Sequence, residues 1–319
     1  MEIGYALSSE EHRPLDLVTY ARRAEERGFD FAMISDHFHP WLDAQGQSPF
    51  VWSVLGAIAT ATDRLPVGTG VTCPLLRIHP AIVAHAAATA GAMMPGRFSL
   101  GLGTGENLNE HVLGDRWPSA TERRAMLREA VGVIRELWSG EVVRHSGDHY
   151  EVVDARLYTL PTEPIELLIA AGSEESAELA AELGGGLVAT APDSTLVAAY
   201  GDAGGDGRRL GQLTVSWADS EDEAIETAMQ WWPNAALRGP LSQELALPQH
   251  FEACLAMVDE ADVAEAIVCG PDPERIIDSI GAFEDAGFDG VYLHQVGPDQ
   301  DGFLSFASEQ LLPSVTADA

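Results

Sequence analysis

Lysine is absent from the sequence. All 18 basic residues are arginine, whereas 50 residues are aspartate or glutamate, so the formal net charge at pH 7 is −32. A field this negative repels nucleic acid and anionic membrane surfaces, and we expect neither as a partner. An acidic surface of this kind is typical of adaptation to high salt, where screening removes the self-repulsion. We therefore expect a halophilic protein.

Cysteine is scarce, and long hydrophobic runs are missing. Cys73, Cys254 and Cys269 lie far apart, with neither a CxxC pair nor the spacing of metal ligands. Such usage is typical of a reducing compartment. No apolar run reaches about 18 residues, so we expect no membrane-spanning helix. The opening segment MEIGYALSSEEHRP lacks the basic and apolar regions of a signal peptide. Together these features predict a cytoplasmic protein without a metal site.

Helix-like and strand-like segments alternate along the chain. Near both ends, a helical stretch is followed by glycine, phenylalanine, aspartate and a strand-like run, and Gly28 and Gly287 are placed to end these helices in the left-handed conformation. The clearest amphipathic helix spans residues 120–138, preceded by Ser119 and Glu122 at capping-box spacing. We expect eight strands, near residues 2–7, 31–36, 66–72, 98–103, 165–171, 186–190, 212–217 and 290–294.

Eight strands that alternate with helices favour an α/β fold, a closed (β/α)8 TIM barrel, over a doubly wound sheet. Two insertions interrupt the alternation. Residues 141–158 predict a β-hairpin that turns at Gly147–Asp148, and residues 232–262 predict a helical insert. No linker or low-complexity segment is present, so we expect residues 1–319 to form a single domain.

Polar and glycine-rich segments follow three of the predicted strands. ISDHFHPW (34–41), GTGVTCP (68–74) and GLGTGENLNE (101–110) end the second, third and fourth strands. Catalytic groups in such barrels lie on the loops at the C-terminal ends of the strands. The side chains that we expect to meet at this rim are Asp36, His37, Trp41, Glu106 and Asn109.

Each of these segments is weak evidence by itself. His37 and His39 would point to opposite sides of a continued strand, which argues against a metal site made by these two histidines. The glycines of GLGTGE can form an ordinary tight turn, and their spacing differs from that of the GxGxxG nucleotide fingerprint. It is the gathering of the segments at one rim that indicates a site.

The segments SDHFHPW, GTGVTCP and GTGENLNE, in this order and at these spacings, resemble the luciferase-like barrel superfamily. Within it they resemble the branch that uses the deazaflavin coenzyme F420, which includes glucose-6-phosphate dehydrogenases. The resemblance extends to LWSGE before the hairpin, IAAG at the fifth strand and the closing GPDPE segment. It implies an F420-dependent oxidoreductase that transfers a hydride between an alcohol or sugar and the coenzyme, and it implies a homodimer.

The resemblance also implies roles for individual residues. His37, Trp41 and Glu106 would surround the reactive face of the deazaflavin as the catalytic set. In the family, strand 3 ends in a bulge with a non-prolyl cis peptide, which maps onto Gly70–Val71. The implied cofactor-binding residues are Asp36, Gly70, Val71, Thr72, Thr104, Gly105, Asn109, Gly172, Ser173, Thr190 and Ala191.

Oxidation of an alcohol needs a base for the hydroxyl proton. His37 suits this role because imidazole titrates near neutrality. Glu106 can instead be the base, or it can supply a proton to the reduced ring. The sequence does not order these roles, and we assign the base to His37. Replacement of His37 by alanine is expected to lower turnover far more than it weakens cofactor binding.

The substrate is where the chain departs from the family. The sugar-phosphate members are known for a cluster of lysines and an arginine around the phosphate, whereas residues 239–274 of this chain contain neither residue type. A buried phosphate without a basic partner is costly. We therefore expect a neutral alcohol or sugar, unless Arg208, Arg209 or Arg238 reaches the site.

Two other functions stay open at this point. An FMN-dependent monooxygenase can use the same barrel, although the set of His37, Trp41 and Glu106 favours the deazaflavin branch. A catalytically silent cofactor-binding protein is the other alternative.

Overall fold

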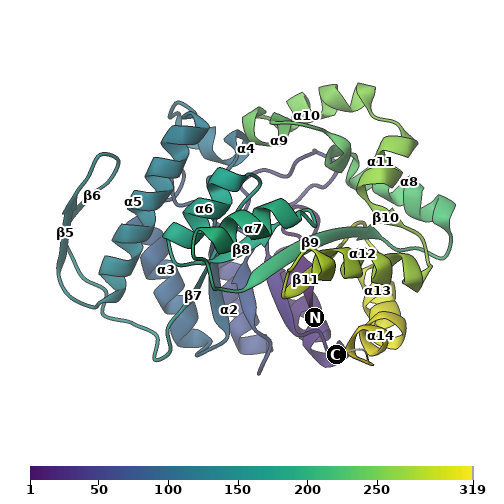
Figure 1. The fold of residues 1–319 in the computed structure, drawn as a ribbon, viewed down its shortest axis with the longest axis horizontal. Helices are drawn as coiled ribbons and strands as arrows, with labels where there is room; N and C mark the ends of the chain where they lie inside the picture. The colour runs from purple at the N-terminus through teal and green to yellow at the C-terminus, as the bar shows by residue number, and fades with distance from the viewer. Residues whose placement is uncertain (318–319) are drawn as a thin grey trace.

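The computed structural model describes residues 1–317 and contains a closed barrel of parallel strands with helices outside it (Figure 1). The strands pair in the order β1–β2–β3–β4–β7–β8–β9–β11, and β11 pairs back with β1. The predicted α/β TIM barrel is therefore confirmed. The barrel strands are β1 (Glu2–Leu7), β2 (Phe31–Ile34), β3 (Val67–Thr69), β4 (Phe98–Leu102), β7 (Glu166–Ala170), β8 (Gly186–Ala189), β9 (Arg209–Ser216) and β11 (Gly290–Gln295).

The helices end where the sequence pattern predicts. Gly28, after the first helix, has φ = 89° and Gly287, after the last helix before β11, has φ = 96°, both in the left-handed region. The side chain of Ser119 accepts a hydrogen bond from the N–H of Glu122 at the start of α5. The main outer helices are α1 (Pro14–Arg27), α2 (Val51–Ala61), α3 (Pro80–Met93), α5 (Ala120–Trp138), α6 (Glu174–Glu182), α7 (Ser194–Asp202), α8 (Glu221–Trp231) and α12 (Pro273–Asp285).

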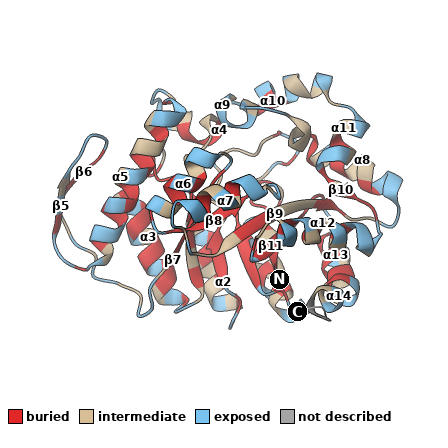
Figure 2. Ribbon diagram, viewed as in Figure 1, coloured by how far each residue is buried: buried red, intermediate tan, exposed pale blue. Residues whose placement is uncertain are grey.

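The strands are buried on both faces (Figure 2). On β2, Phe31 and Met33 belong to the cluster that fills the barrel, together with Leu168 and Tyr292. Ala32 and Ile34 belong to the layer packed against the outer helices. This alternation explains why the strands read as continuous apolar runs, as is usual for parallel sheets. Because the interior is filled, a ligand site can form only at an end of the barrel.

Three segments lie outside the repeating pattern. β5 (Val143–Ser146) and β6 (Glu151–Ala155) form an antiparallel hairpin, which extends along α5 at the left edge of Figure 1. The segment between α8 and β10 (Val268–Cys269), where a helical insert was expected, contains several short helices. These are η2 (Pro233–Ala236), α9 (Leu241–Glu244), α10 (Pro248–Cys254), η3 (Leu255–Met257) and α11 (Glu260–Ala266). The chain closes with α13 (Gln300–Phe306), η4 (Ala307–Leu311) and α14 (Leu312–Ala317).

Two strands end earlier than expected. β2 ends at Ile34 and β3 ends at Thr69, so the polar segments that follow begin sooner. The peptide bond between Gly70 and Val71 is cis, which confirms the prediction for this bond. After β4, the short helices α4 (Asn107–Glu110) and η1 (His111–Leu113) continue the rim. Among residues 1–317, no helix has the length and apolar character needed to cross a membrane.

Candidate active site

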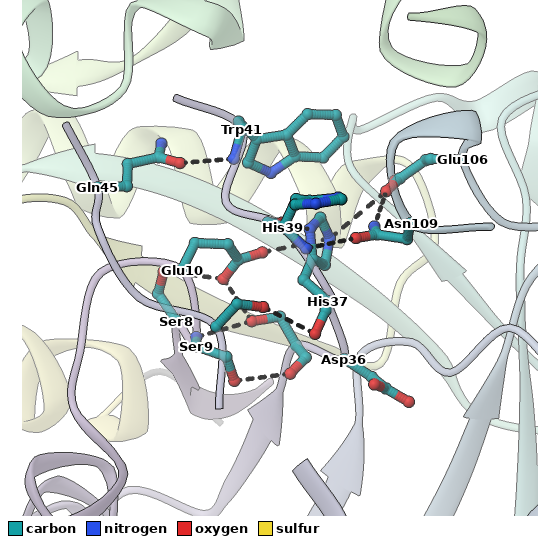
Figure 3. A network of polar contacts seen from close by, with 12 residues as sticks. Ser8, Ser9, Glu10, Asp36, His37, His39, Trp41, Gln45, Glu106 and Asn109 are labelled. Atoms are coloured by element: carbon teal, nitrogen blue, oxygen red, sulfur yellow. Dashed lines mark hydrogen bonds and ion pairs between the residues drawn. The ribbon is translucent and has the colours of Figure 1, made fainter. Parts of the chain in front are cut away.

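A cavity of about 490 Å³ opens at the C-terminal ends of the barrel strands. The segments that follow β1, β2, β3, β4, β7 and β8 line it, together with part of the insert before β10. A volume of this size is typical of a small-molecule or cofactor site. His37, Trp41 and Glu106 all line this cavity, and Figure 3 shows them around one point of the rim.

His37 lies between two carboxylates. Its Nε2 atom is 3.2 Å from Glu10 Oε1 and 3.4 Å from Glu106 Oε2. Its Nδ1 atom is 3.1 Å from the carbonyl oxygen of His39. A carbonyl oxygen can only accept a hydrogen bond, so Nδ1 carries a proton, and Nε2 is also placed to donate. The geometry therefore suits an imidazolium ion (Figure 3).

The pKa values of this cluster move in different directions. Burial alone would lower the pKa of His37, but Glu10 and Glu106 outweigh burial and raise it. For Glu106, burial raises the pKa and outweighs the lowering effect of His37, and Glu10 adds to the rise. For Glu10, burial would raise the pKa, but His37 and the hydroxyl of Ser35 outweigh it, so the pKa is lowered. Glu106 is thus the carboxylate with the greater affinity for a proton, whereas Glu10 stays ionised.

The ion pair between Glu10 and His37 predicts a pH window of stability. The raised pKa of His37 gives stability below its ordinary value of 6.5, which is lost as pH rises through the folded-state value. The lowered pKa of Glu10 gives stability above 4.5, which is lost as pH falls through the folded-state value. We expect the difference in unfolding free energy between the protein and its His37→Gln variant to be largest between pH 4.5 and pH 6.5, where both contributions are fully present. Urea titrations at constant ionic strength measure it, and a difference independent of pH would contradict the pair.

Asn109 and Trp41 complete the surroundings of His37. Asn109 Oδ1 accepts hydrogen bonds from the N–H groups of Phe38 (2.8 Å) and His39 (3.2 Å), and its Nδ2 donates to Glu106 Oε2 (3.0 Å). Asn109 therefore fixes both the loop after β2 and the carboxylate of Glu106. The indole of Trp41 lies 5.1 Å from the imidazole of His37, measured between ring centroids, and walls this side of the cavity.

Asp36 is held by its own neighbours. Its Oδ2 accepts a hydrogen bond from the hydroxyl of Thr72 (2.8 Å), and its Oδ1 accepts one from Arg77 Nη2 (2.9 Å). Arg77 Nε also lies 3.5 Å from Glu110 Oε1. The side chain of Arg77 is 7% exposed and both carboxylate side chains are fully buried. This cluster joins the loops after β2, β3 and β4 beneath the cavity.

Most of the expected cofactor-binding residues border the cavity. Those that line it are Asp36, Gly70, Val71, Thr104, Gly105, Asn109, Gly172 and Thr190. Thr72 is fully buried behind Asp36, and Ser173 and Ala191 are not among the lining residues. At the start of α6, the N–H groups of Gly172 and Ser173 both donate to Ser176 Oγ, so the helix cap already uses these two donors.

Sequence reasoning missed the segment that follows β1. Glu10, from this segment, bonds to His37, and its neighbour Glu11 lies 3.3 Å from Nε2 of His294, measured from Oε2. The signal was present as SSEEH at residues 8–12, directly after a predicted strand. Both Glu10 and His294 line the cavity. Arg77 was missed because nothing in its local sequence indicates burial.

No arginine or lysine lines the cavity in the part of the chain that the structure describes. Arg208 pairs with Glu2 and Glu166, which lie at the starts of β1 and β7, at the opposite end of the barrel. Arg209 pairs with Asp289, just before β11, and Arg238 pairs with Glu265. The three arginines considered as phosphate ligands therefore have other partners. Among residues 1–317, no group of three or more histidine, cysteine, aspartate or glutamate side chains is arranged to hold a metal ion.

Residues 1–290 match the family model described as luciferase-like monooxygenase. The chain belongs to this family. Within the luciferase-like family, F420-dependent glucose-6-phosphate dehydrogenases from Amycolatopsis mediterranei and Nakamurella multipartita are 35% and 36% identical to it. Those alignments cover 99% of this chain and 99% and 97% of theirs. A solved F420-dependent secondary alcohol dehydrogenase in complex with an F420–acetone adduct is 31% identical, with a TM-score of 0.90 and 98% of each chain covered. The resemblance seen in the sequence is confirmed.

Proposed function

We propose that this protein is an F420-dependent oxidoreductase that transfers a hydride between a neutral alcohol or sugar and the deazaflavin. The observation that carries the proposal is the cluster of Glu10, His37 and Glu106 in a cavity whose described lining contains no arginine or lysine. The F420-dependent relatives and the F420-bound solved structure support the choice of cofactor.

The cavity suits a flat ring with one polar side. Val71, Ala170 and Ala189 give it small apolar walls after β3, on β7 and on β8. Glu10, His37 and Glu106 give it a side on which protons can be exchanged. We therefore assign Asp36, Gly70, Val71, Thr104, Gly105, Asn109, Gly172 and Thr190 to the cofactor, with Thr72, Ser173 and Ala191 as supports of those loops.

The bound deazaflavin would supply the carbon that accepts the hydride. We propose Glu106, rather than His37 as expected from the sequence, as the acceptor of the substrate's hydroxyl proton, because His37 already holds protons toward His39 and the two carboxylates. His37 orients Glu106 and can pass its own proton on. Glu10 keeps the imidazolium stable, and Trp41 excludes water from this side.

The substrate class follows from the charges of the cavity. Glu10, Asp36, Glu106 and Glu110 all line it, and the described lining residues include no arginine or lysine. A phosphate dianion there would lose its hydration and meet no arginine or lysine, and the imidazolium of His37 already lies between two carboxylates. A neutral hydroxyl compound has no such cost.

We expect the protein to bind F420 and to reduce it with neutral alcohols. A spectral titration with F420 and with FMN measures binding, and loss of the oxidised deazaflavin absorbance measures turnover. We expect kcat/KM for a small secondary alcohol to exceed that for glucose 6-phosphate by at least about 10²-fold, on the scale of one uncompensated charge. A preference for glucose 6-phosphate would contradict the substrate proposal.

The same titration separates the alternatives. FMN binding with NADH-driven oxygen consumption would support a monooxygenase, and cofactor binding without turnover would support a silent binding protein. We further propose a homodimer on the basis of family resemblance, and a cytoplasmic, halophilic protein on the basis of composition. A single domain is proposed because one closed barrel includes strands from both ends of the chain.

A further inference from the structure

Residues 231–244, here called the substrate-side wall, border the cavity from the insert. The side chains that line the cavity from this wall are Trp232, Asn234, Ala235, Leu237, Ser242 and Gln243. The wall contains only short helical turns, η2 and α9, which have little hydrogen bonding of their own. Its position must therefore be set by contacts with other parts of the chain.

Gln45 holds the beginning of the wall. The side chain is 2% exposed and comes from the loop after β2. Its Nε2 donates to the carbonyl of Trp231 (2.9 Å) and lies 3.4 Å from Asn234 Oδ1. Its Oε1 accepts from the N–H groups of Trp41 (2.9 Å) and Leu42 (3.2 Å), as Figure 3 shows for Trp41. One buried amide thus joins the wall to the segment that carries Trp41.

Arg123 holds the end of the wall. This arginine is 1% exposed at the start of α5 and stacks over the ring of Trp117, with 4.3 Å between its Cζ and the ring centroid. Its Nη2 donates to Gln243 Oε1 (3.0 Å), and its Nη1 donates to the carbonyl of Pro118 (2.8 Å). Nη1 also lies 3.5 Å from Glu244 Oε1. A nearly fully buried arginine is rare unless it is paired, and here two of its partners, Gln243 and Glu244, belong to the wall.

Trp41 connects the wall to the proton-exchanging cluster. Its ring lies 5.1 Å from the imidazole of His37 on one side and 5.2 Å from the ring of Phe251 on the other. Trp41 and Leu237 both pack on a small core of Leu42, Leu108 and Phe251. A shift of the wall would therefore move Trp41 relative to His37.

We infer that Gln45 and Arg123 are positioning residues that hold residues 231–244 as a fixed substrate-side wall, with Gln45 also setting Trp41 against His37. Neither residue touches the reacting atoms. The inference rests on the proposed function for the identity of the substrate, but the positioning itself is a property of the chain. Loss of the contacts of either Gln45 or Arg123 is expected to weaken alcohol binding more than cofactor binding.

The test compares Gln45→Leu and Gln45→Glu with the protein, and Gln310→Leu, at an exposed glutamine, is the control. We expect Gln45→Leu to raise KM for a secondary alcohol about tenfold, as expected for loss of buried hydrogen bonds, with an F420 dissociation constant within about twofold. Hydrogen exchange at the amides of Trp41 and Leu42 should accelerate in Gln45→Leu, whereas Gln45→Glu, which keeps the acceptor, should retain their protection. Arg123→Lys keeps the positive charge but loses the planar guanidinium that donates from two nitrogens. It should raise KM without changing the exchange rates of the Trp41 and Leu42 amides.

Three results would overturn the inference: unchanged exchange in Gln45→Leu, unchanged KM in both Gln45→Leu and Arg123→Lys, or equal losses of alcohol and F420 binding. If Gln45→Leu does not fold, the exchange pattern of Gln45→Glu and the KM of Arg123→Lys decide. Failure of the unsubstituted protein to bind F420 would contradict the proposed function instead. The exchange measurements would still test whether Gln45 positions the segment that carries Trp41.

Discussion

Replacement of His37 by alanine is expected to lower turnover with a neutral alcohol by about 10²–10⁴-fold, the usual contribution of general acid–base catalysis. The F420 dissociation constant should change by less than about threefold, because His37 contacts carboxylates and the His39 carbonyl rather than the apolar walls. Without the imidazolium, Glu10 and Glu106 would face each other unpaired and raise each other's pKa, so Glu106 would be a poor base at neutral pH. Steady-state kinetics and a fluorescence titration with F420 measure the two effects.

His39→Ala is the matched control. His39 comes from the same loop, but its Nδ1 lies 2.9 Å from the carbonyl of Leu108 and its ring stacks on His111 with 5.7 Å between centroids. It does not line the cavity. We expect His39→Ala to retain turnover within about tenfold. If His37→Ala weakens F420 binding strongly and spares turnover, His37 is a cofactor-binding residue instead.

Replacement of Arg77 by alanine is expected to lower the free energy of unfolding by about 3–5 kcal/mol, the scale for removal of one partner of a buried ion pair. The carboxylates of Asp36 and Glu110 are fully buried, and both lie against this guanidinium. Removal of the cation leaves two buried carboxylates without their charge partner. Urea unfolding at high salt measures the loss.

Two further variants give the comparison. Arg116→Ala removes an arginine whose side chain is 76% exposed and paired with Glu122, so it should cost at most about 1 kcal/mol. Glu110→Gln, added to Arg77→Ala, should restore part of the stability, since an amide oxygen can still accept from the N–H groups at positions 76 and 77 that bond to Glu110. If Arg77→Ala lowers the free energy of unfolding no more than Arg116→Ala does, the buried cluster contributes no more to stability than an exposed ion pair.

The barrel could be predicted from the sequence because its signals are local. Glycines such as Gly28 end helices by their own conformational freedom, and the apolar runs of the strands need no knowledge of their partners. The ends of β2 and β3 were placed too late, because an apolar residue such as Val71 continues the pattern after the strand has stopped. The bounds of the short helices within the predicted insert could not be derived, since they depend on contacts such as those of Gln45 and Arg123.

The site could be predicted in part. His37, Trp41 and Glu106 were found because their motifs carry several polar residues at the end of a strand. Glu10 was missed although SSEEH directly follows a predicted strand, because acidic residues are common throughout this chain and the segment does not stand out among them. Its importance comes from its 3.2 Å approach to His37, which lies 27 positions away in the sequence and meets it only when β1 and β2 pair.

The two adjacent glutamates after β1 have a consequence for chain length. Glu10 contacts His37 after β2, whereas Glu11 contacts His294 on β11. The short loop after β1 is therefore bonded to both strands that flank β1 in the barrel. An insertion or deletion of a single residue between Leu7 and Glu10 would displace both carboxylates at once. Surface loops usually tolerate changes in length, and the turn of the β5–β6 hairpin is such a place. Chimaeras and grafted variants of this barrel should therefore keep residues 8–11 at their present length and accept new sequence at the hairpin.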